Sequence, residues 1–351
     1  MFKAGRFVKP ELVGIKTKEA SRAPKRECYD EAMDRRAVIS TVVIGGIIAF
    51  FGAGFVLFAA PQSGAAVEQF VVAPGATSTV VQSVRDQGFV KNAFGLTLAL
   101  HGRRVAPGGY LISKAMNAWQ VANVLAAPPA LRWVVIPEGL RKEEIVELLA
   151  SALGWTEAQK QEWLTIDTVQ PPDYFEGVYF PDTYLVPADE TPAAVANRLR
   201  AKFNEAFAPY APEAVKQNIK WNTLLKVASL IQREAAGKSD MPLIAGILWN
   251  RLLQGMKLEV DATLQYARGN VGQGWWAPIT VADKQLDSPY NTYKYKGLPP
   301  HPIANPGLDA ILAALRPAST TCLYYLHDAT RTIHCASTYA EHQANIERYL
   351  K

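Results

Sequence analysis

The sequence is poor in the residues that build metal and cofactor sites. It has three cysteines and five histidines among 351 residues. The cysteines include no C-x-x-C pair, and the histidines show no H-E-x-x-H or other close ligand spacing, so no metal site is expected. A Gly-rich lysine loop for phosphates and a G-x-S-x-G nucleophile turn are also missing. The sequence therefore predicts no metal and no cofactor.

Charge is missing from residues 38–60, which read VISTVVIGGIIAFFGAGFVLFAA. About 20 apolar residues suffice to cross a bilayer, so this run predicts one transmembrane helix. It begins late and lacks a clear small-residue cleavage site, so we expect a retained anchor. Residues 1–37 hold ten Lys and Arg against six acids. Because basic flanks stay cytoplasmic, we expect a single pass through the cell (inner) membrane, with residues 61–351 outside the cytoplasm.

Excess charge is also low in the rest of the chain. The N-terminal tail accounts for +4 of the net +5, so the chain beyond residue 37 carries about +1. The basic isoelectric point therefore does not indicate a nucleic-acid partner. Cys28 is expected to stay reduced in the cytoplasm. Cys322 and Cys335 flank a polar turn between two strand-like runs, and they form either a disulfide or two half-buried thiols.

Small strand–turn–helix units follow the predicted anchor. Residues 70–84 and 133–149 each give an apolar run, a Pro/Gly turn and a helical pattern, and residues 108–126 give a third unit whose helix begins at Ser113 or Asn117. The inward positions of the first and last helices are Val80, Val81, Val84, Ile145, Leu148 and Leu149. Residues 156–220 are expected to be mostly helical, and the composition of 49% hydrophobic and 20% charged residues fits globular domains.

One irregular stretch, PPDYFEGVYFPDTYLVPADET, interrupts those helices. A long loop in a compact domain is often a binding loop, and aromatic rings suit a sugar, although the same rings would also serve to pack the loop against the protein. The aromatic residues concerned are Tyr174, Phe175, Tyr179, Phe180 and Tyr184.

A carboxylate interrupts the apolar side of the helix predicted over residues 225–237. Glu234 falls among the inward positions Leu224, Val227, Ala228, Ile231 and Ala235, while Lys226, Ser229 and Arg233 fall on the opposite face. Burial favours the neutral carboxyl and raises its pKa, as a general acid requires. Alternatively, Glu234 is a structural residue paired with an arginine or a backbone donor. A second helix follows, with Asp240 as cap, Pro242 in its first turn and Gly255 at its end, which makes a helical hairpin. A last helix is expected in STYAEHQANIERYLK, residues 337–351.

Five segments in this order resemble the endolytic murein transglycosylases of the MltG/YceG-like family. They are EGVYFPDTYLV (176–186), ASLIQREA (228–235), GILWNRLLQGMKLEVDAT (246–263), SPYNTYKYKGLPPHPIANPG (288–307) and the YYLHD hairpin with its later histidine. The likeness is strong over residues 130–350 and weaker over 65–129.

The resemblance implies an α+β fold with four parts. These are a basic cytoplasmic tail (1–37), a transmembrane helix (38–60), a small LysM-like αβ subdomain (61–129) and a mixed catalytic domain with a helical hairpin and a C-terminal β-hairpin (130–351). It implies a membrane-anchored lyase that cuts nascent peptidoglycan glycan strands near their polymerases. In this chemistry an acid protonates the glycosidic oxygen, then accepts the proton of the muramic acid 6-hydroxyl that attacks C1. The product is a 1,6-anhydro end.

By its match to the family motif, Glu234 is the implied catalytic acid and base. The implied substrate-binding residues are Asn250, Arg251, Asp261, Thr263, Tyr266, Tyr290, Asn291, Thr292 and Tyr293, with Pro299 and Asn305 as further candidates. In a purely structural interpretation, Arg251 is an ion-pair strut and the prolines only stiffen loops.

The chain departs from the family at two places. Gln232 stands where many relatives have a first glutamate, and Ala262 stands where relatives often have proline. Three alternatives therefore stay open: a peptidoglycan-binding anchor with weak catalysis, a two-carboxylate hydrolase that uses Asp261 or Glu259 as the partner, and a soluble lyase of chorismate metabolism.

Overall fold

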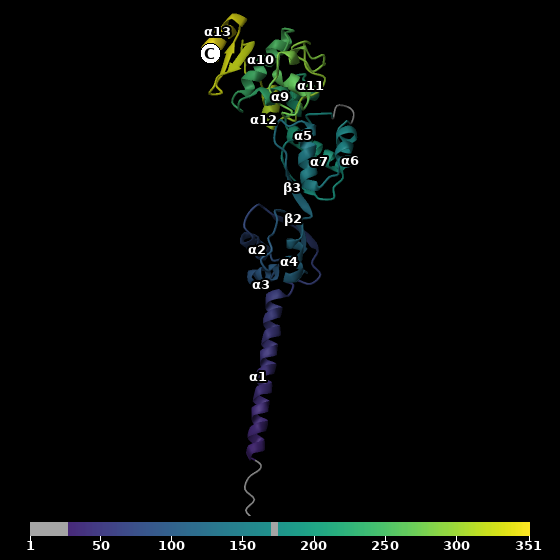
Figure 1. The fold of residues 1–351 in the computed structure, drawn as a ribbon, viewed down its shortest axis with the longest axis vertical. Coiled ribbons are helices and arrows are strands. Elements are labelled where there is room, and N and C mark those ends of the chain that lie inside the picture. The colour runs from purple at the N-terminus through teal and green to yellow at the C-terminus, as the bar shows by residue number, and fades with distance from the viewer. Residues whose placement is uncertain (1–26, 170–174) are drawn as a thin grey trace, which may run out of the picture.

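The computed structural model describes residues 27–169 and 175–351, and the molecule is elongated (Figure 1). The long helix α1 (Glu27–Phe58) projects from one end. A small αβ subdomain follows, then a larger α+β body, and the C-terminal hairpin and helix lie at the far end. The expected mixed α+β class is confirmed at this level. Tyr174 and most of the basic tail lie outside the described residues.

Helix α1 contains the predicted apolar span. Residues Arg35–Phe58 form 24 helical residues, and an 18-residue window within them has a mean hydropathy of 2.4. The apolar run is long enough to cross a bilayer by length and composition. The helix ends at Phe58, two residues before the predicted end of the span.

The small subdomain contains β1 (Val67–Val72), α2 (Thr77–Asp86), α3 (Ala93–Leu100), β2 (Gly108–Ser113) and α4 (Ala118–Ala126). Val80, Val81 and Val84 are buried as predicted. Asn117 begins α4 with a reciprocal capping box to Gln120, so the second of the two predicted starts is confirmed. Helix α3 was not predicted, because its sequence AFGLTLAL is apolar nearly all round and gives no helical period.

A four-stranded antiparallel sheet connects the subdomain to the body in the order β1-β2-β3-β4. Strand β3 spans Leu131–Val135 and β4 spans Thr183–Pro187. Strands β2 and β3 pair only at Gly109 and Leu131. Glycine is needed there, because a Cβ on Gly109 would lie 2.9 Å from the Leu131 side chain. The sheet is therefore continuous but narrow between the two cores.

The first half of the body is mostly helical, as predicted. It contains α5 (Lys142–Leu153), α6 (Glu157–Glu162), a π-helical turn (Trp163–Asp167), α7 (Pro192–Phe207) and α8 (Ala211–Lys216). Ile145 and Leu149 are buried, but Leu148 is 37% exposed, so its predicted inward position is wrong. Strand β4 was also missed, because its segment is short and rich in loop-forming residues.

The second half is a helical layer built around the predicted hairpin. It contains α9 (Trp221–Glu234), α10 (Met241–Leu253), α11 (Asp261–Arg268), a 3-10 turn (Ala282–Gln285) and α12 (Leu308–Leu315). Helix α10 starts after Asp240 and ends before Gly255 as expected, but the Asp240 side chain makes no cap hydrogen bond. Helix α9 ends at Glu234 rather than near Gly237, because the backbone is already extended at Ala235.

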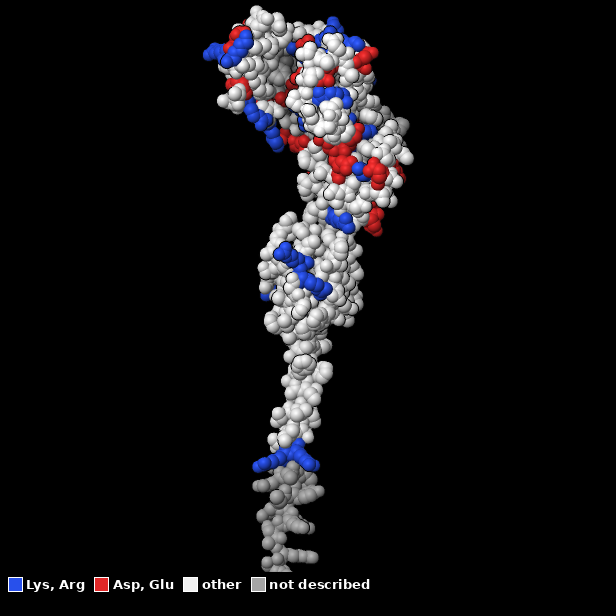
Figure 2. All heavy atoms as spheres, in the orientation of Figure 1, with Lys and Arg blue, Asp and Glu red and all other residues white. Residues whose placement is uncertain are grey.

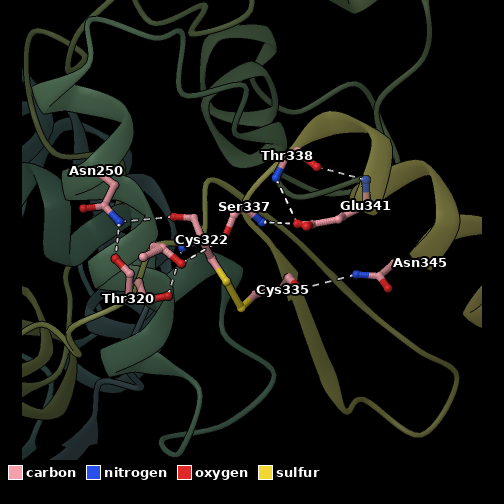
Figure 3. The surroundings of a disulfide bond; sticks show 9 residues. Asn250, Thr320, Cys322, Cys335, Ser337, Thr338, Glu341 and Asn345 are labelled. Carbon is pink, nitrogen blue, oxygen red and sulfur yellow. Dashed lines mark hydrogen bonds between the residues drawn. A yellow bond between two sulfur atoms is a disulfide. The ribbon is translucent and has the colours of Figure 1, made fainter.

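The C-terminal module consists of β5 (Tyr324–His327), β6 (Ile333–Ala336) and α13 (Tyr339–Tyr349). The hairpin and the last helix are thus confirmed. Cys322 and Cys335 form a disulfide with a Cα–Cα distance of 5.9 Å (Figure 3). Asn345 of α13 donates a hydrogen bond to the Cys335 carbonyl, so the helix is attached to the hairpin at this bond.

Candidate active site

Helix α9 brings a carboxylate to the edge of the larger core. Leu224, Val227, Ala228 and Ile231 are fully buried, as the amphipathic pattern predicted. The opposite face is less solvated than expected. Ser229 is buried and accepts a hydrogen bond from the Ile303 amide. Arg233 is half-buried, with its guanidinium 3.8 Å from the ring centroid of Trp276. The predicted placement of these two side chains in solvent is wrong, because the 275–303 loops cover that face.

Glu234 is the last residue of α9, and its side chain contacts two other segments. The Tyr325 hydroxyl of β5 donates a 2.6 Å hydrogen bond to Oε2 of Glu234. The backbone amide of Ala262, in the first turn of α11, also donates to this carboxyl group. A helix N-terminus favours negative charge, so α11 supports the ionised form. The carboxyl is therefore held by three elements that are distant in sequence.

The protonation of Glu234 reflects opposing influences. Burial raises the pKa of its carboxyl group above the ordinary value, and the negative charge of Asp261 raises it further. The hydrogen bonds from Tyr325 and the Ala262 amide, together with His327, lower it. Burial is the largest effect, so the pKa is raised overall. A carboxyl group in this state can hold a proton nearer to neutral pH and still act as a hydrogen-bonded carboxylate after losing it.

Glu234 opens onto a pocket of about 500 Å³ between the helical layer and the C-terminal module. Figure 2 shows the molecule hollowed between these two parts. The lining is mainly polar and aromatic: Glu234, Leu248, Arg251, Leu258, Glu259, Asp261, Tyr293, Tyr324, Tyr325, Leu326, His327, Tyr339 and His342. Such a lining offers hydrogen bonds and ring faces, as a sugar requires.

Three of the predicted binding residues, Arg251, Asp261 and Tyr293, line the same pocket as Glu234. The Tyr293 hydroxyl donates a hydrogen bond to Oδ1 of Asp261. The guanidinium of Arg251 donates to the carbonyls of Leu323, Lys257 and Leu258. Arg251 also pairs with Glu259 at 3.3 Å. Arg251 therefore holds β5 and the segment before α11 around the pocket, as the structural interpretation proposed.

Four other predicted binding residues do not line this pocket. Asn250 donates to the carbonyls of Thr320 and Cys322, which attaches α10 to the hairpin (Figure 3). Thr263 and Thr292 are buried and hydrogen-bonded to each other at 2.9 Å. Asn291 is fully buried and accepts a hydrogen bond from the Tyr293 amide. Their polar groups hold the loops that carry Asp261 and Tyr293.

Tyr266 and Tyr290 belong to a separate internal cluster. Their ring centroids lie 4.8 Å apart, and the guanidinium of Arg141 lies 4.2 Å from the Tyr266 ring. This cluster surrounds the buried Glu176, to which the Asn305 amide donates. Burial raises the pKa of the Glu176 carboxyl to about 8. These two tyrosines and Asn305 therefore support the loops of the body and do not line the pocket.

The described part of the aromatic stretch, residues 175–191, also packs inward. Tyr179 is fully buried, and Phe180 and Tyr184 are 8% and 7% exposed. The Tyr184 hydroxyl donates to the Phe180 carbonyl. Phe175 stacks near His301, with a centroid distance of 4.9 Å. The expected sugar platform is therefore wrong for Tyr179, Phe180 and Tyr184, and these side chains join the larger core instead.

Sequence reasoning missed the contribution of the C-terminal module. Tyr324, Tyr325 and His327 come from β5, and Tyr339 and His342 come from α13. His327 contacts the Asp240 carboxylate at 3.1 Å, which connects β5 to the start of α10. The Tyr324 and His342 rings stack at 5.4 Å. The sequence signals were the YYLHD segment, one of the five that carry the family resemblance, and its density of Tyr and His, which also suits a plain strand.

Comparisons with known proteins agree with the resemblance. The "Endolytic murein transglycosylase" of Streptococcus pneumoniae serotype 2 (strain D39 / NCTC 7466) is 34% identical over 177 residues, which are 50% of this chain and 32% of that protein. The protein of the same name from Bacillus subtilis (strain 168) is 36% identical over 178 residues, or 50% of this chain and 48% of that protein. The chain thus matches between about a third and a half of the length of these relatives.

A solved structure and a family model extend the likeness over most of the chain. A crystal structure of a YceG-like protein from Listeria monocytogenes covers 80% of this chain and 99% of its own, with 26% identity and a TM-score of 0.56. The model of the YceG-like family matches residues 70–348, from strand β1 to the end of α13. The chain therefore belongs to the YceG-like family.

Proposed function

We propose that this protein is a membrane-anchored endolytic transglycosylase that cleaves peptidoglycan glycan strands. The observation that carries the proposal is Glu234, which lies at the end of an open pocket with a raised pKa and two hydrogen-bond donors. The relatives named endolytic murein transglycosylase support the substrate class. Helix α1 is the proposed single-pass anchor, with the basic tail in the cytoplasm and residues 61–351 outside it, near the strands that the protein cuts.

In the proposed mechanism, Glu234 acts first as acid and then as base. Its proton goes to the glycosidic oxygen as the bond from that oxygen to C1 of the muramic acid breaks. The 6-hydroxyl of the same sugar attacks C1, and its proton returns to Glu234. No water is consumed, so one carboxyl group suffices, and the attacking group is already part of the substrate. The released strand ends in a 1,6-anhydro ring.

The remaining pocket residues have supporting roles in this proposal. Tyr325 and the Ala262 amide stabilise the carboxylate form of Glu234 between the two proton transfers. Arg251 holds the two sides of the pocket together. The rings of Tyr324 and Tyr339 offer faces for neighbouring sugars. Residues 61–129 remain a proposed LysM-like subdomain that binds peptidoglycan, and nearby polymerases remain proposed partners.

A second candidate is a two-carboxylate hydrolase. It is favoured by Asp261 and Glu259, which line the same pocket as Glu234. In that reaction a second carboxylate activates water or attacks the sugar. However, Asp261 already accepts a hydrogen bond from Tyr293, and Glu259 pairs with Arg251. The products separate the two candidates, because hydrolysis adds one water to each cut strand.

The test is to incubate the full chain in detergent with purified peptidoglycan and to weigh the fragments. We expect anhydro ends, and we expect Glu234→Gln to lower the rate by at least about a hundredfold. Glu68→Gln, at an exposed acid of β1, is the control and should retain activity. Reducing ends would support the hydrolase instead. Bound but uncut strands would indicate a binding anchor.

A further inference from the structure

The end of the apolar helix α1 is built into the small subdomain. The side-chain amide of Asn92 donates to the carbonyls of Val56 and Leu57 at 3.2 and 3.4 Å. The same side chain accepts a 2.7 Å hydrogen bond from the Gly95 amide and so caps α3. A Cβ on Gly95 would lie 2.1 Å from the Leu57 carbonyl oxygen, so only glycine allows this approach. Helices α1 and α3 therefore form one joined unit.

A ring contact fixes the other side of α1. Phe58, the last residue of α1, stacks on Trp119 of α4 with a centroid distance of 5.2 Å. The subdomain therefore contacts the last turn of the apolar helix through both α3 and α4. The subdomain therefore lies directly against the end of the proposed membrane span.

The length of α1 sets how close this turn lies to the lipid. The pair Arg35–Arg36 marks the charged end of the span, and the apolar residues begin at Ala37. A hydrocarbon layer of about 30 Å needs about 20 helical residues. Counted from Ala37, the twentieth residue is Val56. The segment held by Asn92 is therefore at the lipid boundary when α1 spans the bilayer, and α3 and the start of α4 are at the same level.

The subdomain exposes large apolar side chains at this level. Phe94 and Leu98 are 61% and 45% exposed and lie one turn apart on α3, and Trp119 is 48% exposed. Figure 1 shows α3 at the end of the subdomain beside α1. Exposed apolar groups are unfavourable in water but favourable in the bilayer interface, where tryptophan is enriched.

The charge of the subdomain suits the same surface. Residues 61–129 contain five Lys and Arg against two acids, whereas residues 130–351 have a small acidic excess. Blue side chains are prominent on the visible face of the subdomain in Figure 2. The ammonium nitrogen of Lys91 lies 4.6 Å from the ring centroid of Phe55, so this cation is held against α1 close to the lipid boundary. Basic groups at this height are attracted to anionic lipids.

We propose that the α3–α4 end of the subdomain is a lipid-docking surface, in which Phe94, Leu98 and Trp119 insert into the headgroup layer around the exit of α1. The partner that covers this docking surface is the surface of a phospholipid bilayer. The inference rests on the proposed membrane anchoring, but it adds a second membrane contact. Docking would fix the angle between the body and the bilayer, and hence the height at which the pocket meets a glycan strand.

The test uses the full chain in nanodiscs that contain phosphatidylglycerol. Cys28→Ser removes the thiol outside the disulfide, and a polarity-sensitive fluorophore is attached to a single new cysteine. The test position is Leu98→Cys. The matched control is Val71→Cys, which is 44% exposed against 45% for Leu98. Val71 pairs with Gly109, which in turn pairs with Leu131 of β3, so the control lies at the end of the subdomain that joins the body. Val43→Cys, within α1, reports whether the helix spans the bilayer.

We expect lipids with a headgroup quencher to remove most of the emission from position 98, and aqueous iodide to have little effect there. The label at 71 should show the reverse. If 98 and 71 respond alike while deep lipid quenchers reach 43, the anchor is right and docking is wrong. If 98 is shielded from iodide but not quenched by lipid, a second copy covers the surface, which also overturns the proposal. If lipid quenchers located deep in the bilayer do not quench the label at position 43, the proposed anchoring itself is wrong.

Discussion

At the scale of single residues, the site depends on how Glu234 is solvated. A carboxyl at the end of α9 would be exposed and acidic if the helix stood alone. Packing of β5 and α11 against it removes water, which raises its pKa, and supplies two donors that lower the pKa again. The balance gives a group that can both release and recover a proton, which the proposed reaction requires.

We predict that Tyr325→Phe moves the alkaline limb of the cleavage rate to higher pH. Tyr325 donates to the charged form of Glu234, so it lowers the carboxyl pKa. Without that donor the carboxyl keeps its proton to higher pH, and a step that needs the protonated acid persists there. The loss of this charge-assisted hydrogen bond sets the direction of the shift, toward higher pH. The pH dependence of kcat/KM measures it.

A matched control is Tyr295→Phe, which removes a 2.6 Å hydrogen bond from a tyrosine hydroxyl to Asp287 outside the pocket. It should leave the pH profile unchanged. If the alkaline limb of the Tyr325→Phe variant stays in place or moves to lower pH, this hydrogen bond does not control the pKa of the catalytic acid.

At the scale of elements, strand β5 of the hairpin β5–β6 forms one side of the pocket, and the helical layer forms the other. Tyr325 pairs with Cys335 across the hairpin, and Cys322 lies two residues before β5. The disulfide therefore joins the two ends of the hairpin that carries the partner of Glu234. Asn250 of α10 donates to the Cys322 carbonyl beside it, so the hairpin is also fixed to the helical layer (Figure 3).

We predict that replacing both Cys322 and Cys335 with serine destabilises the C-terminal module and lowers cleavage. Closing a loop of this length contributes about 3 kcal/mol to the free energy of unfolding. Loosening β5 also weakens the placement of Tyr325 and His327. Thermal unfolding and the cleavage rate, each with and without reductant, measure the two effects. The wild type should respond to reductant and the double variant should not. Equal stability of the wild type and the double variant in the absence of reductant would contradict the prediction.

At the scale of the whole molecule, helices α9 and α13, which carry pocket residues, lie far from α1, with the small subdomain between them (Figure 1). The body is joined to the subdomain by a sheet whose middle strands pair at one position. The proposed anchor, spacer and catalytic body therefore follow one another along the length of the molecule. This arrangement suits a substrate that is a polymer above the membrane.

We predict that a phosphatase reporter that folds only outside the cytoplasm is active when fused after Lys351. The basic residues before the apolar helix favour a cytoplasmic N-terminus, and the disulfide between Cys322 and Cys335 favours an oxidising compartment. A cytosolic reporter at the same position should be inactive. Activity of the cytosolic reporter alone would support a soluble lyase with a cytoplasmic substrate.

The sequence alone determined the features that depend on local pattern. The apolar run of α1, the capped helices α4 and α13, the helical hairpin and Glu234 could be identified from periodicity, caps and short motifs, because each depends on residues within a few turns of one another. Only the tertiary structure decided which side chains share the pocket with Glu234. Tyr325 lies 91 positions away along the chain, and Thr263 and Tyr266 turn inward because Thr292 and Glu176, 29 and 90 positions away, satisfy their hydroxyl groups. Burial and hydrogen-bond satisfaction are properties of the packed molecule, so no local pattern could assign them.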